Sequence, residues 1–208
     1  MTSGNRLQHS PYIHETICIV ANGSSILKTP KGPRIDEFGV VGRINNYRVR
    51  GFENFVGSKT NVWFNGANQN LKSPEQQAES TVVLIPSSIL NRKGEAIDNR
   101  ICRRLKVKSK DYYTLVSKEE ILSFEQKVGS QRLTTGTKSI LWAIGRFREV
   151  YIHGFDFFID SKTHYNDPPL TKWLITKGLI KKAEKHDMRR EKEYITTLLD
   201  QGIIRKLD

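Results

Sequence analysis

The chain has 208 residues, and its 34 lysines and arginines against 22 aspartates and glutamates give a formal net charge of +12. Apolar residues make up 37% and charged residues 27%, a composition that excludes a collagen, a mostly disordered chain and a repeat array. No apolar run reaches the roughly 18 residues that a membrane span needs. We expect one domain over residues 15–208, large enough to bury its own core, preceded by a flexible arm over residues 1–14.

The cysteines and the start of the sequence bear on the compartment. Cys18 and Cys102 are the two cysteines, and they lack the CxxC spacing of a metal or redox site. Residues 1–9 are polar and contain no apolar signal region. These features predict reduced thiols and a cytoplasmic protein.

The first half of the chain carries four short apolar runs, each bounded by turn residues. Such runs, rich in β-branched residues, are typical of buried strands. We expect strands over residues 16–21, 38–44, 61–65 and 81–86.

The second half alternates between helical and strand patterns. Ser117 and Glu120 form a capping box, which predicts a helix to about residue 127. A helical pattern over 139–147 is followed by a strand pattern over 149–154. A last helix is expected over 187–201, because Asp187 can cap its start and Gly202 ends it. The alternation predicts an α/β domain with a mostly parallel sheet flanked by helices.

Polar segments follow the expected strands or open an expected helix. They are Asn22-Gly23-Ser24, Asn45, Thr134-Thr135-Gly136 and Gly154-Phe155-Asp156. Ligands in parallel sheets bind beyond the carboxyl ends of the strands, so these segments predict a common site. The helix start at 134–136 would offer free N–H groups and the positive end of the helix dipole to an anion.

Two histidines lie in polar contexts late in the chain. His164 begins the loop 164–167, and His186 precedes the last helix, with Glu191 in that helix's first turns. A histidine with a pKa of about 6.5 can accept a proton from a hydroxyl at neutral pH. Either histidine is therefore a candidate general base.

Taken in order, these segments resemble the four sialylmotifs of the sialyltransferases, chiefly the animal-type enzymes of glycosyltransferase family 29 and also the small bacterial ones. Residues 17–63 resemble the large motif, and residues 132–157 resemble the small motif. Residues 164–167 fit the third motif. His186 and Glu191 fit the HxxxxE pattern of the very small motif.

The resemblance implies a GT-A-like fold, an inverting glycosyl transfer, a CMP-sugar donor such as CMP-sialic acid, a glycan or glycolipid acceptor, and no metal or other cofactor. It implies that His186 removes the acceptor proton and that His164 assists the departing phosphate, with Glu191 as the third catalytic residue. The implied donor-binding residues are Asn22, Gly23, Ser24, Asn45, Thr134, Thr135, Gly136, Gly154, Asp156 and Tyr165.

Some assignments stay open. The context of His164 fits the base of the small bacterial enzymes better than that of His186 does, so the base is either histidine. The small motif lacks the cysteine through which the secreted enzymes join their large and small motifs. Alternatives are a CMP-Kdo-type transferase of the same fold, a nucleotide-binding relative without activity, and a basic nucleic-acid-binding module. The last explains the charge but not the motifs, and no nucleic acid partner is expected. A basic cluster is a candidate for contact with an anionic membrane: Lys181, Lys182, Lys185, Arg189 and Arg190.

Overall fold

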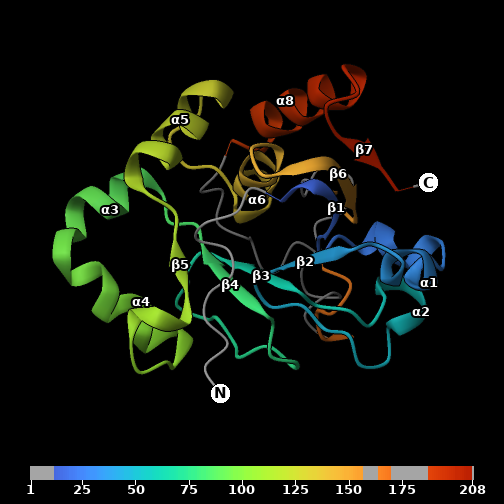
Figure 1. Cartoon of the computed structure of the whole chain (residues 1–208), viewed down its shortest axis with the longest axis horizontal. Coiled ribbons are helices and arrows are strands. Elements are labelled where there is room, and N and C mark those ends of the chain that lie inside the picture. Colours follow the sequence, from blue (N-terminus) through green and yellow to red (C-terminus); the bar gives the residue numbers. More distant parts are fainter. Residues whose placement is uncertain (1–11, 157–163, 170–186, 208) are drawn as a thin grey trace.

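The architecture is a parallel sheet with helices around it (Figure 1). The structure is a computed structural model, and it describes residues 12–156, 164–169 and 187–207. Within these residues, seven strands form one sheet in the order β5-β4-β3-β2-β1-β6-β7. Every pair of neighbouring strands is parallel. The α/β fold class predicted from the sequence is therefore confirmed.

The bounds of the elements are as follows. The strands are β1 (Tyr12–Val20), β2 (Val40–Ile44), β3 (Val62–Asn65), β4 (Ser80–Val83), β5 (Thr114–Leu115), β6 (Phe147–His153) and β7 (Arg205–Lys206). The α-helices are α1 (Gly32–Asp36), α2 (Glu53–Val56), α3 (Ser87–Lys93), α4 (Ile97–Leu105), α5 (Lys118–Val128), α6 (Thr135–Ile144) and α8 (Met188–Asp200). Three short 3-10 turns are η2 (Ser24–Lys28), η3 (Gly94–Ala96) and η4 (Lys110–Tyr112).

The alternation of side chains along β1 builds a core on each face of the sheet. Ile17 and Ile19 belong to the larger core, to which α4, α5, α6 and α8 contribute. Cys18 and Val20 point the other way, into a smaller core that includes residues of α1 and α2. A strand that is buried on both faces reads as a continuous apolar run, which is why the sequence around 17–20 lacks polar alternation.

The chain order places a crevice at the carboxyl ends of the central strands. The chain adds strands from β1 outward to β5 and then returns to place β6 on the other side of β1. At such a reversal the connections leave the sheet in opposite directions and open a ligand-binding space.

The structure corrects several boundaries. β1 begins at Tyr12, so residues 12–14 of the predicted arm are strand, whereas residues 1–11 lie outside the described residues. The helix predicted over 139–147 occupies Thr135–Ile144 instead, because Thr134 caps it. The helices α1 to α4 and the two-residue strands β5 and β7 were not predicted, since their runs are too short for a clear period.

Both cysteines are free thiols, as predicted. Burial in β1 raises the pKa of Cys18 to about 12, which keeps its thiol protonated. No helix in the described part of the chain is long and apolar enough to cross a bilayer.

A buried arginine holds the loop after α2 against β2. The Arg43 side chain is inaccessible to solvent. Its Nε donates to the Lys59 carbonyl and to Thr60 Oγ1, at 3.0 and 2.9 Å. Its Nη2 donates to the carbonyls of Val56, Gly57 and Lys59. The guanidinium therefore fixes the loop that connects α2 to β3.

We predict that Arg43→Met destabilises the fold. The substitution leaves several buried carbonyls without a donor, so the free energy of unfolding should fall by about 3 kcal/mol or more in urea denaturation. Arg103→Met, at an exposed position of α4, is the matched control and should change it by no more than about 0.5 kcal/mol. Equal, small effects in both variants would contradict the role given to Arg43.

Candidate functional site

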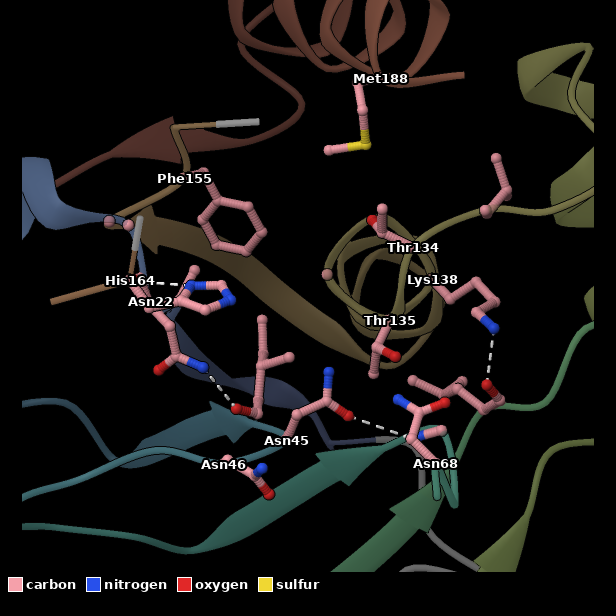
Figure 2. Close-up of a pocket in the computed structure, with 18 of the residues that line it drawn as sticks. Asn22, Asn45, Asn46, Asn68, Thr134, Thr135, Lys138, Phe155, His164 and Met188 are labelled. Carbon is pink, nitrogen blue, oxygen red and sulfur yellow. Dashed lines mark hydrogen bonds between the residues drawn. The ribbon is translucent and has the colours of Figure 1, made fainter. Parts of the chain in front are cut away.

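A cavity of about 590 Å³ opens at the carboxyl ends of the strands. Its wall includes the residues that follow β1, β2, β3, β4 and β6, together with the first turn of α6 (Figure 2). Most of the residues predicted from the sequence line it: Asn22, Gly23, Asn45, Thr134, Thr135, Gly136, Gly154, Asp156 and His164. Ser24, Tyr165 and Glu191 do not line it, and His186 lies outside the described residues.

The start of α6 presents backbone donors to the cavity. Thr134 is the N-cap, and its Oγ1 accepts from the Thr137 N–H at 3.1 Å. Among the described residues, nothing accepts a hydrogen bond from the N–H groups of Thr135 or Gly136. Two free donors at the positive end of a helix dipole form a site for an anionic group.

Glu191 of α8 also binds the N-terminal cap of α6. Its carboxylate is fully buried and accepts from Thr134 N at 3.0 Å and from Thr134 Oγ1 at 2.6 Å. It also accepts from the Thr137 hydroxyl. The sequence predicted a catalytic role for Glu191, but its oxygens face α6 rather than the cavity. The structure makes it a positioning residue for the start of α6.

Two asparagines stand at the ends of β1 and β2. Asn22 Nδ2 donates to the Ile44 carbonyl at 2.9 Å, while its buried Oδ1 has no partner within the described residues. Asn45 has a left-handed backbone, with φ of 49°, a conformation that asparagine tolerates better than most residues. Its Oδ1 accepts from Gly66 N at 3.2 Å. An unsatisfied buried oxygen at a cavity wall marks a place where a ligand donor fits.

Close backbone packing explains the glycines around β1 and β6. A Cβ on Gly23 would lie 2.4 Å from Asp156 Cγ and 2.5 Å from the Gly154 carbonyl oxygen. Gly154 itself has φ of +72°, which disfavours other residues. The Asp156 carboxylate accepts from Ser25 N at 2.9 Å and from the Ser25 hydroxyl, so it fixes the turn that follows β1.

His164 is held against the same turn. Its backbone forms an isolated bridge with Gly23, and its N–H donates to Asp167 Oδ2 at 2.8 Å. The ring nitrogen Nδ1 lies 3.2 Å from the Asn22 carbonyl oxygen, which can only accept, so Nδ1 carries the proton. In that tautomer Nε2 carries the lone pair of the ring and is the nitrogen that can accept a proton.

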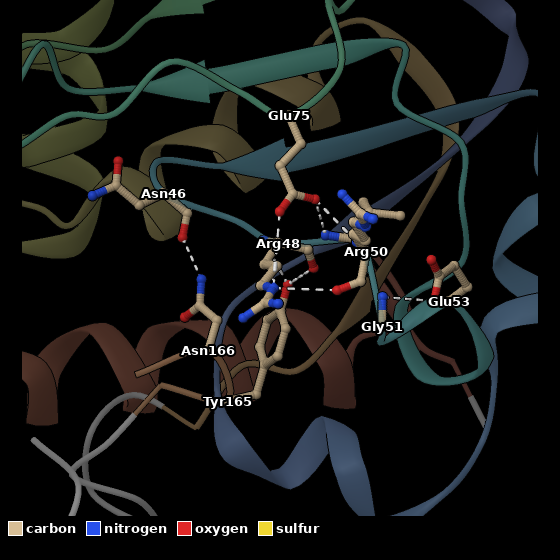
Figure 3. A network of polar contacts seen from close by, with 9 residues as sticks. Asn46, Arg48, Arg50, Gly51, Glu53, Glu75, Tyr165 and Asn166 are labelled. Carbon is tan, nitrogen blue, oxygen red and sulfur yellow. Dashed lines mark hydrogen bonds and ion pairs between the residues drawn. The ribbon is translucent and has the colours of Figure 1, made fainter. Parts of the chain in front are cut away.

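Tyr165 points away from the cavity, contrary to the prediction that it binds donor. Its ring is 2% exposed and packs edge-on against Phe52. Its hydroxyl accepts from Arg48 N at 2.9 Å and donates to the Arg48 carbonyl (Figure 3). Asn166 Nδ2 donates to the Asn46 carbonyl at 2.8 Å in the same region. These contacts tie the segment around His164 to the loop after β2.

The sequence analysis missed the cationic residues of the cavity. Lys72, Arg100, Arg132 and Lys138 all line it. Lys138 is 2% exposed, and its Nζ donates to the Leu84 carbonyl at 2.6 Å. The sequence did contain a signal for Lys138, because it lies inside the apolar helical pattern of 137–144. A lysine is rarely buried in such a helix unless a partner or a ligand compensates its charge.

The basic cluster is only partly described. Lys181, Lys182 and Lys185 lie outside the described residues. Arg189 pairs with Glu193 at 3.0 Å, and Arg190 pairs with Asp187 at 3.1 Å. Within the described residues, no group of three or more His, Cys, Asp or Glu side chains could hold a metal ion.

Comparisons with known proteins agree with this geometry. Residues 5–203 match the model of glycosyltransferase family 29 (sialyltransferase). A CMP-N-acetylneuraminate-beta-1,4-galactoside alpha-2,3-sialyltransferase from Rattus norvegicus is 26% identical over 219 residues, which cover 91% of this chain and 56% of that protein. The chain thus spans about half the length of the curated relatives it matches. Sialyltransferase-like protein 2 from Oryza sativa subsp. indica is 40% identical over 55 residues, or 26% of this chain and 14% of that protein.

Solved structures share the fold. The crystal structure of a mammalian sialyltransferase superposes with a TM-score of 0.69 at 23% identity, covering 93% of this chain and 68% of the other. The monofunctional alpha-2,3-sialyltransferase Cst-I from Campylobacter jejuni gives a TM-score of 0.62 at 16% identity, covering 93% and 75%. The GT-A-like fold expected from the resemblance is confirmed. From the extent of the family match we conclude that the chain belongs to glycosyltransferase family 29, the sialyltransferases.

Proposed function

We propose that the protein transfers sialic acid from CMP-sialic acid to a hydroxyl of a glycan or glycolipid, with inversion and without a metal. The observation that carries the proposal is the convergence of three features on one cavity. They are the unpartnered Oδ1 of Asn22, the free N–H groups of Thr135 and Gly136, and Nε2 of His164. Together they match a nucleoside, a phosphate and a proton transfer. The sialyltransferase CstII from Campylobacter jejuni, which is similar to this chain in fold, has been solved with a substrate analogue, cytidine-5'-monophosphate, and this supports the choice of donor.

The chemistry follows from the charges that develop. As the bond between the sugar and the phosphate breaks, negative charge builds on the phosphate and positive charge on the sugar ring. The N–H groups at the start of α6 oppose the first of these charges without rearrangement. His164 lines the same cavity, and its Nε2, when protonated, would add a charged donor to the phosphate.

The proton of the acceptor hydroxyl must also be removed. We assign this step to His186, in keeping with the resemblance, and the assistance of the phosphate to His164. Attack on the face of the sugar opposite the phosphate inverts the anomeric centre. We also propose that the basic cluster contacts an anionic membrane, and a cytoplasmic location stays the prediction from the sequence.

The alternatives differ in what they bind. Family membership argues against the nucleic-acid-binding module. A CMP-Kdo-type transferase would use a different acidic sugar on the same nucleotide. A relative without activity would bind CMP and transfer nothing.

One test of this proposal concerns the nucleotide. Calorimetric titration at two salt concentrations should show that CMP binds more tightly than UMP or AMP, with a preference that survives the higher salt. An assay with CMP-sialic acid and a panel of galactose-ended acceptors should then release CMP faster than hydrolysis by water does, and only when an acceptor is present. Equal, salt-sensitive binding of all three nucleotides would overturn the proposal.

Asn45→Asp offers a sharper test of the same pocket. Aspartate keeps an acceptor for Gly66 N but replaces the Nδ2 donor with negative charge beside an anionic ligand. CMP affinity should fall by about tenfold or more. Asn91→Asp, exposed on α3, controls for the added charge and should leave affinity unchanged.

A further prediction separates the two histidines. His164→Asn retains a side-chain donor for the Asn22 carbonyl, so the loop should keep its place. Both His164→Asn and His186→Ala should lower kcat by about 10²–10⁴-fold while CMP affinity stays within a few-fold. Loss of the base should slow transfer more than donor hydrolysis, whereas loss of phosphate assistance should slow both. If His164→Asn shows the first pattern, the two assignments are exchanged.

Another prediction concerns Glu191. Glu191→Gln weakens three charge-assisted hydrogen bonds to Thr134 and Thr137, so the free energy of unfolding should fall by about 1–3 kcal/mol. Because Glu191 faces α6, the shape of the dependence of kcat on pH should be unchanged. A new or missing ionisation in that profile would restore a catalytic role for Glu191.

A further inference from the structure

Lys138 is a buried cation whose hydrogen bonds are incomplete. It belongs to α6, one turn after the cap Thr134. It lines the cavity, although only 2% of its surface is exposed to solvent. An ammonium has three N–H donors. Within the described residues, the one acceptor that Lys138 Nζ reaches is the Leu84 carbonyl, at 2.6 Å.

Neighbouring carboxylates do not complete the site. Glu125 of α5 and Glu191 of α8 attract the ammonium, and Arg132 repels it. Glu125 is engaged by the N–H and hydroxyl of Ser87, and Glu191 by Thr134 and Thr137. Neither forms an ion pair with Lys138 within 4.0 Å. Burial outweighs both carboxylates and lowers the pKa of Lys138 to about 7.

The position of Lys138 relates it to one part of the donor. Figure 2 shows Asn22 and His164 on one side of the start of α6, and Lys138 on the other side, beyond Thr135. A nucleotide on Asn22 and Asn45, with its phosphate at Thr135 and Gly136, would direct the attached sugar toward Lys138. Sialic acid carries its carboxylate on the same carbon that bears the phosphate.

We propose that Lys138 binds the carboxylate of the donor sugar and thereby selects acidic sugars. The inference rests on the proposed function. The donor is favoured over an acidic acceptor because Lys138 is buried and lies one turn after the start of α6, whose N–H groups are proposed to hold the donor phosphate. A carboxylate there would satisfy the ammonium's remaining donors and compensate its buried charge.

The test compares donor and nucleotide in Lys138→Met. The KM for CMP-sialic acid should rise by about 10- to 100-fold, the range expected for one lost charge-assisted hydrogen bond. CMP affinity should stay within about twofold, since CMP lacks the carboxylate. Methionine removes a buried charge at similar volume, so the variant should melt no lower than the wild type. Lys127→Met, exposed on α5, should alter neither quantity.

The dependence of donor affinity on pH provides a second test, because this dependence would not change if Lys138 served only to pack the core. Donor affinity of the wild type should decline above about pH 7, as the ammonium loses its proton. Lys138→Arg, whose guanidinium stays charged, should show a flatter profile.

The outcomes separate this inference from the proposed function. If Lys138→Met weakens CMP and CMP-sialic acid equally, or changes only the KM of an acidic acceptor, the inference is overturned while sialyl transfer stands. If the wild type neither binds CMP nor transfers sialic acid, the proposed function fails first. A rise confined to the donor KM supports both.

Discussion

The site depends on one carboxylate that the chain supplies from its last helix. Glu191 accepts hydrogen bonds from the N–H and hydroxyl of Thr134 and from the Thr137 hydroxyl. This contact joins α8 to the start of α6 and sets the direction in which the remaining N–H groups point. It also places negative charge at one side of a positive helix end, so the N–H groups of Thr135 and Gly136 act on the opposite side, in the cavity.

Buried charge plays two different parts in this fold. The Arg43 side chain makes five hydrogen bonds to the loop 56–60. Its role is therefore structural, because it holds the loop that precedes β3 against β2. Lys138 is almost as deeply buried, but its ammonium makes a single hydrogen bond with the described residues, and it borders the cavity. The number of satisfied donors, rather than burial, distinguishes the cation that holds the scaffold from the one suited to a ligand.

Much of the fold and of the site could be read from the sequence. The apolar runs of β1 to β4 and the caps Ser117, Thr134 and Asp187 are local signals, and the structure places them as elements or caps. The convergence of Asn22, Asn45 and the 134–136 turn follows from parallel strands alone. The direction in which a side chain points could not be predicted from these local signals. Tyr165 turns to the Arg48 backbone and Glu191 to α6, and both orientations depend on contacts across more than 50 residues.

The position of β1 has a consequence for how the chain folds. β1 is central, yet one of its two neighbours is β6, so that Ile17 pairs with Val150. During synthesis, the apolar edge of β1 must remain without that partner until most of the chain has emerged. Such a long separation makes folding slow and leaves an exposed strand edge in the meantime. Truncation upstream of β6 would therefore yield an aggregating fragment rather than a smaller domain.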